Sequence, residues 1–218
     1  MKFLVLSDLH LTQKFNKKKY LLLKELFNQY ENIVINGDFY DGYLTTFDKF
    51  VKSQWSKLFP LLKSKNVIYI YGNHDVPEYV DNRVLLFSSG QQKSCKLKVG
   101  NNSYYIDHGH DKVPISTDNP KIRYVKMFLT EKIYDFFVNF MVNIFKEDYF
   151  IIAKLGNKFI KKWQKRNVNK DEIYISAHSH FQEADSANNY YNSGVFNYHL
   201  AQFLVIDDEG VKLYRKRY

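Results

Sequence analysis

Residues 3–10 read Phe3-Leu4-Val5-Leu6-Ser7-Asp8-Leu9-His10, a short apolar run that passes directly into an acidic residue and a histidine. Short apolar runs that end in polar residues are typical of buried β-strands. Four later runs rich in Val, Ile and Tyr have the same form, so five such strands are predicted. They cover residues 3–6, 33–35, 67–71, 104–106 and 173–175.

A polar cluster follows each predicted strand. The clusters are Asp8-Leu9-His10, Gly37-Asp38-Phe39-Tyr40-Asp41-Gly42, Gly72-Asn73-His74-Asp75, His108-Gly109-His110 and His178-Ser179-His180. Six of the seven histidines fall within them, and only His199 lies elsewhere. Ligand sites of α/β proteins form where the carboxyl ends of the strands meet. We therefore expect these side chains to converge on one site.

Helical patterns separate the first predicted strands. Residues 17–30 repeat their apolar positions with a period close to 3.6, and residues 45–65 do likewise, with Pro60 as the expected point of division. This alternation predicts an α/β sheet covered by helices. Turn-forming residues further along the chain predict two hairpins. The hairpins pair residues 93–99 with 104–106 and 203–206 with 211–214.

Residues 120–166 interrupt this alternation, and two long helices are predicted there, over 122–145 and 149–166. The first is apolar around most of its circumference and carries one narrow polar stripe. An apolar surface of this width would bind an amphipathic substrate or, alternatively, would pack on the second helix and the core, or form a dimer. In the second, the apolar residues Ile152, Leu155, Phe159 and Trp163 share one face, while lysines cover the other faces. We interpret the segment as a helical cap inserted into a single domain that spans residues 1–218.

Most of the formal net charge of +9 is carried by one region, since residues 121–170 contain twelve Lys or Arg against four Asp or Glu. A localised basic surface favours an anionic partner, which would be a nucleic acid, an acidic lipid or a phosphorylated substrate. A solvated helix face is the alternative interpretation.

The single cysteine, Cys95, cannot form an internal disulfide and is expected to be a buried strand residue. The apolar run at the start is too short for the core of a signal peptide, and Asp8 ends it. No uncharged stretch reaches the roughly 20 residues that a membrane-spanning helix needs. These features predict a cytoplasmic protein.

Imidazole and carboxylate ligands suit Zn, Fe and Mn. The spacing of Asp8 from His10, and of His178 from His180, predicts that both side chains of each pair point the same way from an extended segment. Seven plausible ligands are too many for one tetrahedral ion and predict a two-metal site with one bridging carboxylate. Two ions roughly 3.5–4 Å apart hold the attacking and leaving oxygens of a displacement at phosphorus.

In this order the clusters resemble the five motifs of the calcineurin-like metallophosphoesterases. The matching residues are Asp8-x-His10, Gly37-Asp38-x-x-Asp41, Gly72-Asn73-His74-Asp75, His108-Gly109-His110 and Ala177-His178-Ser179-His180. The likeness continues into Asn192-Ser193-Gly194, which is similar to the Asn-x-Gly turn that follows the last motif. The resemblance implies a four-layer αββα sandwich, here with a helical cap, and a hydrolase acting on phosphoester or diphosphate bonds.

The resemblance also implies a role for each motif residue. His74 would lie at the substrate phosphate, and Asp41 would orient it through the other ring nitrogen. The nucleophile would be a hydroxide shared by two divalent ions, for which Mn²⁺ is expected and Fe, Zn or Co are alternatives. The expected ligands are Asp8, His10 and His180 for one ion, Asn73, His108 and His178 for the other, and Asp38 for both.

Other polar residues near the motifs are interpreted as structural. His110 and His199 are expected to be ordinary polar residues, and Asp107 and Asp111 to be polar neighbours of the fourth motif. Asp75 is expected to satisfy backbone groups in its turn.

In size, in the Asp-Leu-His-Leu opening and in the inserted cap, the chain is closest in layout to the bacterial UDP-2,3-diacylglucosamine pyrophosphatases. That likeness implies a nucleotide-linked lipid as substrate, with the basic, Phe-rich cap of residues 121–166 holding acyl chains or docking on the anionic inner membrane surface. The chain departs from this group at His74, where the group carries Arg. The same chemistry on a soluble nucleotide or a nucleic acid, and a non-catalytic metal-binding scaffold, are the competing hypotheses.

Overall fold

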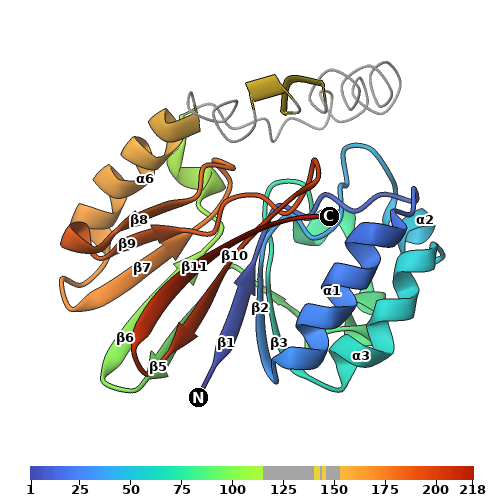
Figure 1. The fold of residues 1–218 in the computed structure, drawn as a ribbon, viewed down its shortest axis with the longest axis horizontal. Helices are drawn as coiled ribbons and strands as arrows, with labels where there is room; N and C mark the ends of the chain where they lie inside the picture. Colours follow the sequence, from blue (N-terminus) through green and yellow to red (C-terminus); the bar gives the residue numbers. More distant parts are fainter. Residues whose placement is uncertain (115–139, 143, 146–152) are drawn as a thin grey trace.

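The computed structural model of the chain describes residues 1–114, 140–142, 144–145 and 153–218, which form two β-sheets with helices on their outer faces (Figure 1). The expected αββα order of layers is confirmed. Most of the expected cap, residues 120–166, lies outside the described residues. Within it, residues 140–142 and 144–145 are helical, and the helix expected over 149–166 is described as α6 (Lys154–Asn167).

The first sheet is built around β1 (Phe3–Leu6), whose four apolar side chains are all buried. β2 (Asn32–Asn36) runs parallel to β1, and β3 (Asn66–Ile70) runs parallel to β2. The short strand β4 (Gln91–Gln92) extends this parallel part beyond β3. The strand order is β11-β10-β1-β2-β3-β4.

Both predicted hairpins are present. The hairpin of β10 (Leu200–Asp207) and β11 (Gly210–Arg217) completes the first sheet, with β10 antiparallel to β1. The hairpin of β5 (Ser94–Val99) and β6 (Asn102–Asp107) begins the second sheet. Cys95 is buried on β5 as expected.

The second sheet has the order β5-β6-β7-β9-β8. β7 (Glu172–Ser176) runs parallel to β6, and β9 (Tyr190–Asn192) runs parallel to β7. The edge strand β8 (Glu183–Asp185) is antiparallel to β9. The sequence analysis did not predict β4, β8 or β9, because two or three residues are too few to show a period.

Helices cover the outer face of the first sheet. α1 (Lys17–Gln29) begins where the Asn16 side chain accepts a hydrogen bond from the Lys19 amide at 3.0 Å. The predicted helix over 45–65 consists of three shorter ones. They are α2 (Phe47–Val51), the 3-10 helix η1 (Gln54–Leu58) and α3 (Phe59–Lys63).

The segment is divided twice. One division falls at Ser53, whose hydroxyl accepts a hydrogen bond from the Trp55 amide and starts η1. The other falls between Leu58 and Phe59, next to Pro60, where the sequence predicted it. Pro60 lies in the first turn of α3, where a missing N–H costs nothing. The described chain also contains short 3-10 helices, which are η2 (Pro77–Tyr79), η3 (Asn82–Leu86), η4 (His110–Lys112) and η6 (Ser186–Asn188).

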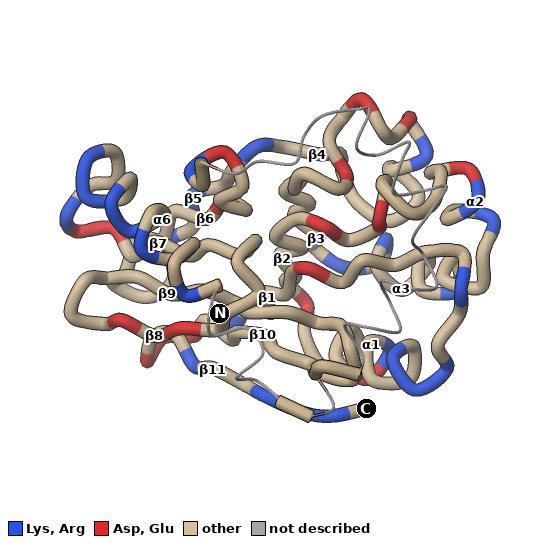
Figure 2. The backbone as a smooth tube through the Cα atoms, turned by 90° about the horizontal axis from the view of Figure 1, so that it is seen from above, with Lys and Arg blue, Asp and Glu red and all other residues tan. Residues whose placement is uncertain are grey.

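α6 covers the outer face of the second sheet and carries many of the basic residues (Figure 2). It packs on the sheet through Asn157, Ile160 and Gln164, whereas Leu155 and Phe159 are exposed. Two of the three packing residues are polar because they hydrogen-bond to loops of the second sheet. The apolar face seen in the sequence is therefore exposed at Leu155 and Phe159, whereas Trp163 of the same face packs against the second sheet.

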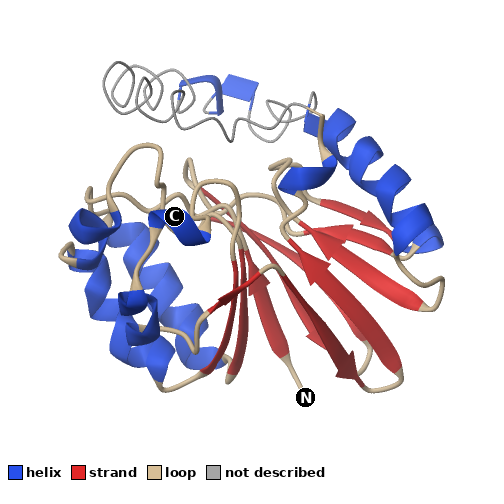
Figure 3. Cartoon of the chain, turned by 180° about the vertical axis from the view of Figure 1, so that it is seen from behind, coloured by secondary structure: helices blue, strands red, loops and turns tan. Residues whose placement is uncertain are grey.

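The two sheets face one another, with helices on the outer side of each (Figure 3), and three apolar layers hold this sandwich together. One lies between the first sheet and α1–α3, one lies between the two sheets, and one lies between α6 and the second sheet around Ile160, Tyr174 and Tyr190. Among the described helices, none is long and apolar enough to cross a bilayer.

Two leucines of α1 test the first of these layers. Leu23 is fully buried and Leu21 is 53% exposed. We expect Leu23→Ala to lower the free energy of unfolding by about 2–5 kcal/mol, because it removes apolar contacts and leaves a cavity. The matched control Leu21→Ala should change it by less than about 0.5 kcal/mol. Urea unfolding of both variants measures the difference, and equal losses would contradict the packing described here.

Candidate metal centre

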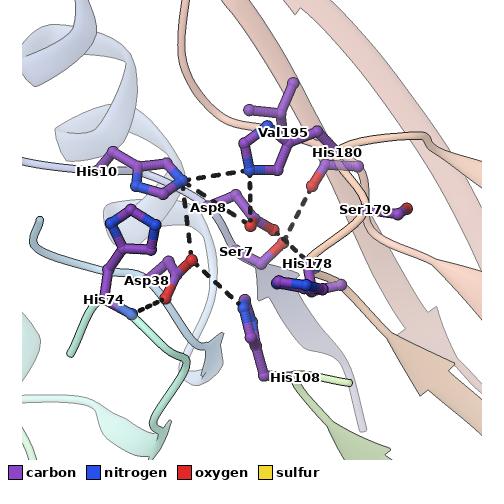
Figure 4. Close-up of polar contacts among 12 residues, drawn as sticks. Ser7, Asp8, His10, Asp38, His74, His108, His178, Ser179, His180 and Val195 are labelled. Carbon is purple, nitrogen blue, oxygen red and sulfur yellow. Dashed lines mark hydrogen bonds and ion pairs between the residues drawn. The ribbon is translucent and has the colours of Figure 1, made fainter. Parts of the chain in front are cut away.

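The loops that follow β1, β2, β6 and β7 meet at one edge of the two sheets (Figure 4). Each loop contributes at least one of the side chains that the sequence predicted to converge. Three groups of side chains there have ligand atoms close enough to share a cation. One of them is His10, Asp41 and His74. The other two contain predicted ligands alone, and they are Asp8, His10 and His180, the first group, and Asp38, His108 and His178, the second group.

In the first group, the nitrogens and oxygens face a common point. His180 Nε2 lies 3.1 Å from Asp8 Oδ1, and His10 Nε2 lies 3.3 Å from His180 Nε2. Asp8 is fully buried. Two imidazoles and a carboxylate at these distances form a donor set that suits a transition metal.

The second group is centred on Asp38, which is also buried. His108 Nε2 lies 3.3 Å from Asp38 Oδ2, and the same oxygen lies 3.8 Å from His10 Nε2 in the first group. Asp38 therefore stands between the two groups. His108 donates from Nδ1 to the Asn36 carbonyl at 2.8 Å, which directs its Nε2 at the centre.

Three buried polar atoms at this centre make no hydrogen bond within the described part of the chain. They are Asp8 Oδ1, Asn73 Oδ1 and His108 Nε2. Buried polar atoms are normally paired, and all three can offer a lone pair to a cation. The side chains present therefore fit divalent metal ions.

Burial and nearby charges set the protonation of these imidazoles. Burial, with His108 beside it, lowers the pKa of His178 to about 3, so this ring is neutral at pH 7. For His108 burial acts in the same direction, but the Asp38 carboxylate outweighs it and raises the pKa of His108 to about 10. A metal ligand must be deprotonated, so a cation at this position would replace the proton of His108.

Asp41 joins the centre to His74. Its Oδ1 accepts a hydrogen bond from His74 Nδ1 at 2.9 Å, the contact that the resemblance implied. Its Oδ2 lies 3.3 Å from His10 Nδ1, which the sequence analysis did not predict. Asp41 therefore orients one predicted ligand as well as the predicted catalytic histidine, and it contacts both rings through Nδ1.

The family of the chain follows from a match over nearly its whole length. The sequence model of the calcineurin-like phosphoesterases matches residues 1–204. The chain belongs to the calcineurin-like phosphoesterase family. It is accordingly a hydrolase that acts on phosphoester bonds. No curated protein sequence shows a significant match to it.

Solved structures share the fold of this phosphoesterase at low sequence identity. YfcE, a phosphoesterase from E. coli, has a TM-score of 0.53 and 15% identity, over 100% of this chain and 99% of that one. Vacuolar protein sorting 29 from Cryptosporidium parvum has a TM-score of 0.50 and 13% identity, over 100% of this chain and 97% of that one.

The backbone of the phosphoesterase at the motifs is unusual. Five predicted ligands adopt positive φ, a region that residues other than glycine seldom occupy. They are Asp8, His10, Asp38, His178 and His180. The expectation of extended segments at the two i, i+2 pairs is therefore wrong. The paired side chains converge because both members of each pair are left-handed, a strained conformation that is concentrated at functional sites.

Two motif glycines leave room for the ligands. A Cβ added to Gly72 would overlap Asp38 Oδ1, and one added to Gly37 would overlap the His108 ring. Asp75 supports the same region, since its carboxylate accepts hydrogen bonds from the Asp38, Phe39 and Gly72 amides. The structural role expected for Asp75 is consistent with these contacts.

Asn157 of α6 supports the fifth motif, and the sequence analysis missed it. Its buried Oδ1 accepts a hydrogen bond from Ser179, between His178 and His180, at 2.7 Å. The Asn192 side chain donates to the same oxygen at 3.0 Å, so the Asn-Ser-Gly turn lies against this motif. A polar residue on a basic helix gives no signal of burial in the sequence, so only the fold reveals it.

The remaining polar residues lie near the centre without joining either group. The His110 ring is 6.3 Å from the His178 ring, and His199 is exposed. Asp107 is not an ordinary surface neighbour, because it is buried and its carboxylate accepts from Tyr174 at 2.6 Å and faces Lys112 at 2.8 Å. Asp111 is exposed and pairs with Lys93 at 3.0 Å.

His74 gives a test of this geometry. We expect His74→Ala to slow phosphodiester hydrolysis by on the order of 10²–10⁴, because a positioned proton donor contributes an effect of that size. Metal content, measured by elemental analysis of the purified variant, should equal that of wild type, since Asp41 still holds His10. Loss of metal from this variant would show that His74 is a ligand.

Proposed function

We propose that this phosphoesterase hydrolyses its substrate with two divalent ions. Asp8, His10 and His180 would hold one ion, Asn73, His108 and His178 the other, and Asp38 both. The position of the Asp38 carboxylate between the two ligand groups carries this proposal. When bound, two such ions lower the pKa of water and neutralise the charge that develops at phosphorus. Mn²⁺ is the proposed metal, because the mixed Asp, Asn and His donor set includes hard oxygens.

His74 and Asp41 would act on the substrate itself. The Asp41 carboxylate fixes the tautomer and direction of the His74 ring through Nδ1. His74 Nε2 is then available to stabilise the phosphoryl oxygens or to give a proton to the leaving oxygen. The His74 amide donates to Asp38 Oδ1 at 2.9 Å, which ties this residue to the carboxylate between the two ligand groups.

Asp38→Asn tests the proposal. The substitution removes a negative charge but keeps an oxygen that can accept from the His74 amide. We expect hydrolysis of an aryl phosphodiester to fall by more than about 10²-fold, because loss of even an outer-shell partner costs roughly 10–100-fold. Added Mn²⁺ should raise the melting temperature of wild type, since a ligand that binds only the folded state stabilises it. It should not raise that of the variant.

Asp208→Asn is the matched control, because the Asp208 carboxylate is 70% exposed and lies outside the centre. It should retain both the turnover and the Mn²⁺ response of wild type. Equal turnover by wild type and Asp38→Asn would reject the catalytic centre, and a wild type without any turnover would favour a non-catalytic scaffold.

For the natural substrate we propose a nucleotide-linked lipid such as UDP-2,3-diacylglucosamine, met at an anionic membrane surface. The described part of the expected cap supports this proposal. α6 carries six basic residues and no acidic one, and its exposed face also presents Leu155 and Phe159. A face that is both basic and apolar suits an amphipathic molecule or an anionic bilayer better than a nucleic acid.

Removing the acyl chains from the substrate tests whether the protein recognises a lipid. We expect kcat/KM for the diacylated nucleotide diphosphate to fall at least about tenfold when both chains are absent, because buried methylene groups contribute to binding. Assays of both compounds with the same protein measure the ratio. Equal kcat/KM values for the two compounds would indicate a soluble nucleotide as the substrate. Nucleic-acid binding that weakens steeply with salt would indicate a nucleic acid.

A further inference from the structure

Lys19 is a charged residue on the buried face of α1. The buried residues of this helix are Lys19, Leu23, Leu26 and Phe27, which recur with the spacing of a helical face that packs on a core. The three apolar members belong to the layer between the first sheet and its helices. Lys19 is only 4% exposed, and lysine is rarely buried to this extent unless its ammonium has partners. The position of Lys19 must therefore be explained by what its ammonium contacts.

The ammonium of Lys19 lies against the loop of the first motif. Its Nζ donates to the Leu9 carbonyl at 2.5 Å and to Asn197 Oδ1 at 3.1 Å. Leu9 is fully buried and lies between the predicted ligands Asp8 and His10. A buried carbonyl without a donor is costly, and a charged donor makes a stronger hydrogen bond than a neutral one. Lys19 therefore stabilises the backbone between two predicted metal ligands.

The peptide group between Leu9 and His10 is held at both ends. Lys19 binds its oxygen, and its N–H, which belongs to His10, donates to the Asp38 carbonyl at 2.9 Å. Because a peptide group is planar, fixing its oxygen and its N–H restricts the φ angle of His10. That angle is 46°, in the left-handed region that a residue other than glycine seldom adopts. Lys19 and the Asp38 carbonyl together enforce the backbone from which the His10 ring reaches the centre.

The position of Lys19 is itself fixed by two other segments. Its amide donates to the Asn16 side chain at the start of α1, and its ammonium is held by Asn197. Asn197 is followed by Tyr198 and His199, which both have positive φ. Such strained backbone persists only where its surroundings enforce it. The ammonium therefore joins α1, the first motif and the segment that leads into β10.

We infer that Lys19 is a positioning residue for one metal ion of the proposed centre, the ion held by Asp8, His10 and His180. It acts through the Leu9 carbonyl and is not itself a ligand. The inference rests on the proposed function, because it requires that divalent ions bind these side chains. Partners that orient metal ligands contribute roughly 10–100-fold to metal affinity. Lys19 differs from the usual partner in that it holds the backbone of a ligand and not its ring.

Lys19→Met tests the inference, because methionine keeps much of the apolar stem and removes the ammonium. We expect calorimetric titration of the metal-free variant with Mn²⁺ to show one ion bound about tenfold more weakly than in wild type, and the other unchanged. Lys18→Met is the matched control, since Lys18 is the exposed neighbour on α1, and it should bind both ions as wild type does.

Two results of this titration would overturn the inference. One is unchanged affinity for both ions in Lys19→Met. The other is tighter binding, which would mean that Lys19 acts on the ions only as a like charge that repels them through space.

Ligand variants identify the ion that Lys19 affects. His178→Ala removes a ligand of the second group, and His180→Ala removes a ligand of the first. Adding Lys19→Met should weaken the Mn²⁺ that remains in His178→Ala about tenfold and leave the Mn²⁺ that remains in His180→Ala unchanged. Equal effects in the two backgrounds, or the reverse pattern, would contradict the assignment to the first group.

Urea unfolding of the metal-free proteins separates positioning from stability. A purely structural lysine would lower the free energy of unfolding in Lys19→Met without changing the Mn²⁺ affinity of the folded protein, and that result would overturn the inference. If Lys19→Met does not fold, Asn197→Leu removes one of the two oxygens that hold the ammonium. This variant should weaken the same ion about threefold, the effect of losing one hydrogen bond, and unchanged binding would again overturn the inference.

The titration of wild type keeps the two proposals apart. A wild type that binds no Mn²⁺ would refute the two-metal function and, with it, the role of Lys19. A wild type that binds two ions, beside a Lys19→Met that binds both equally tightly, would refute the role of Lys19 alone.

Discussion

The Asp38 carboxylate is ionised, buried and placed between two clusters of imidazoles. The arrangement of the loops at the strand ends depends on keeping this buried carboxylate ionised. Burial alone would raise the pKa of Asp38, but His108 and His74 outweigh that effect and hold the pKa well below its usual value. Breaking such a buried pair by removing one partner is strongly destabilising, because the other charge is left uncompensated. Both sheets must therefore present their loops at the same edge, since Asp38 follows a strand of the first sheet and His108 a strand of the second.

The backbone around this carboxylate is strained, and neighbouring residues hold it in place. Five predicted ligands have positive φ, which costs about 1–3 kcal/mol for each residue and persists only where the surroundings enforce it. Asp75 provides part of that enforcement through three backbone amides and Tyr69. Burial, with Asp38 nearby, raises the pKa of Asp75 to about 6, so this support is itself sensitive to the charge at the centre. Gly37 and Gly72 complete the arrangement by leaving space that any side chain would fill.

α6 links the centre to the region expected to contact the natural substrate. Its inner face holds the fifth motif through Asn157 and Ser179, while its outer face exposes lysines together with Leu155 and Phe159. A pocket of about 360 Å³ adjoins the same centre at His74 and His10.

The sequence alone determined the parallel strands, their hairpins and the set of residues that converge. Apolar runs ending in Asp, Asn or His are local patterns, and the edge where they meet follows from the geometry of parallel strands. The sequence did not determine the left-handed backbone of Asp8 and His10, because φ at a non-glycine residue is imposed by its surroundings. The contact of Asp41 with His10, the burial of Asn157 and the outward direction of Leu155 and Phe159 were also decided only by the tertiary structure. Each depends on segments far apart in the chain, and a periodicity within one segment carries no information about which other segment it will meet.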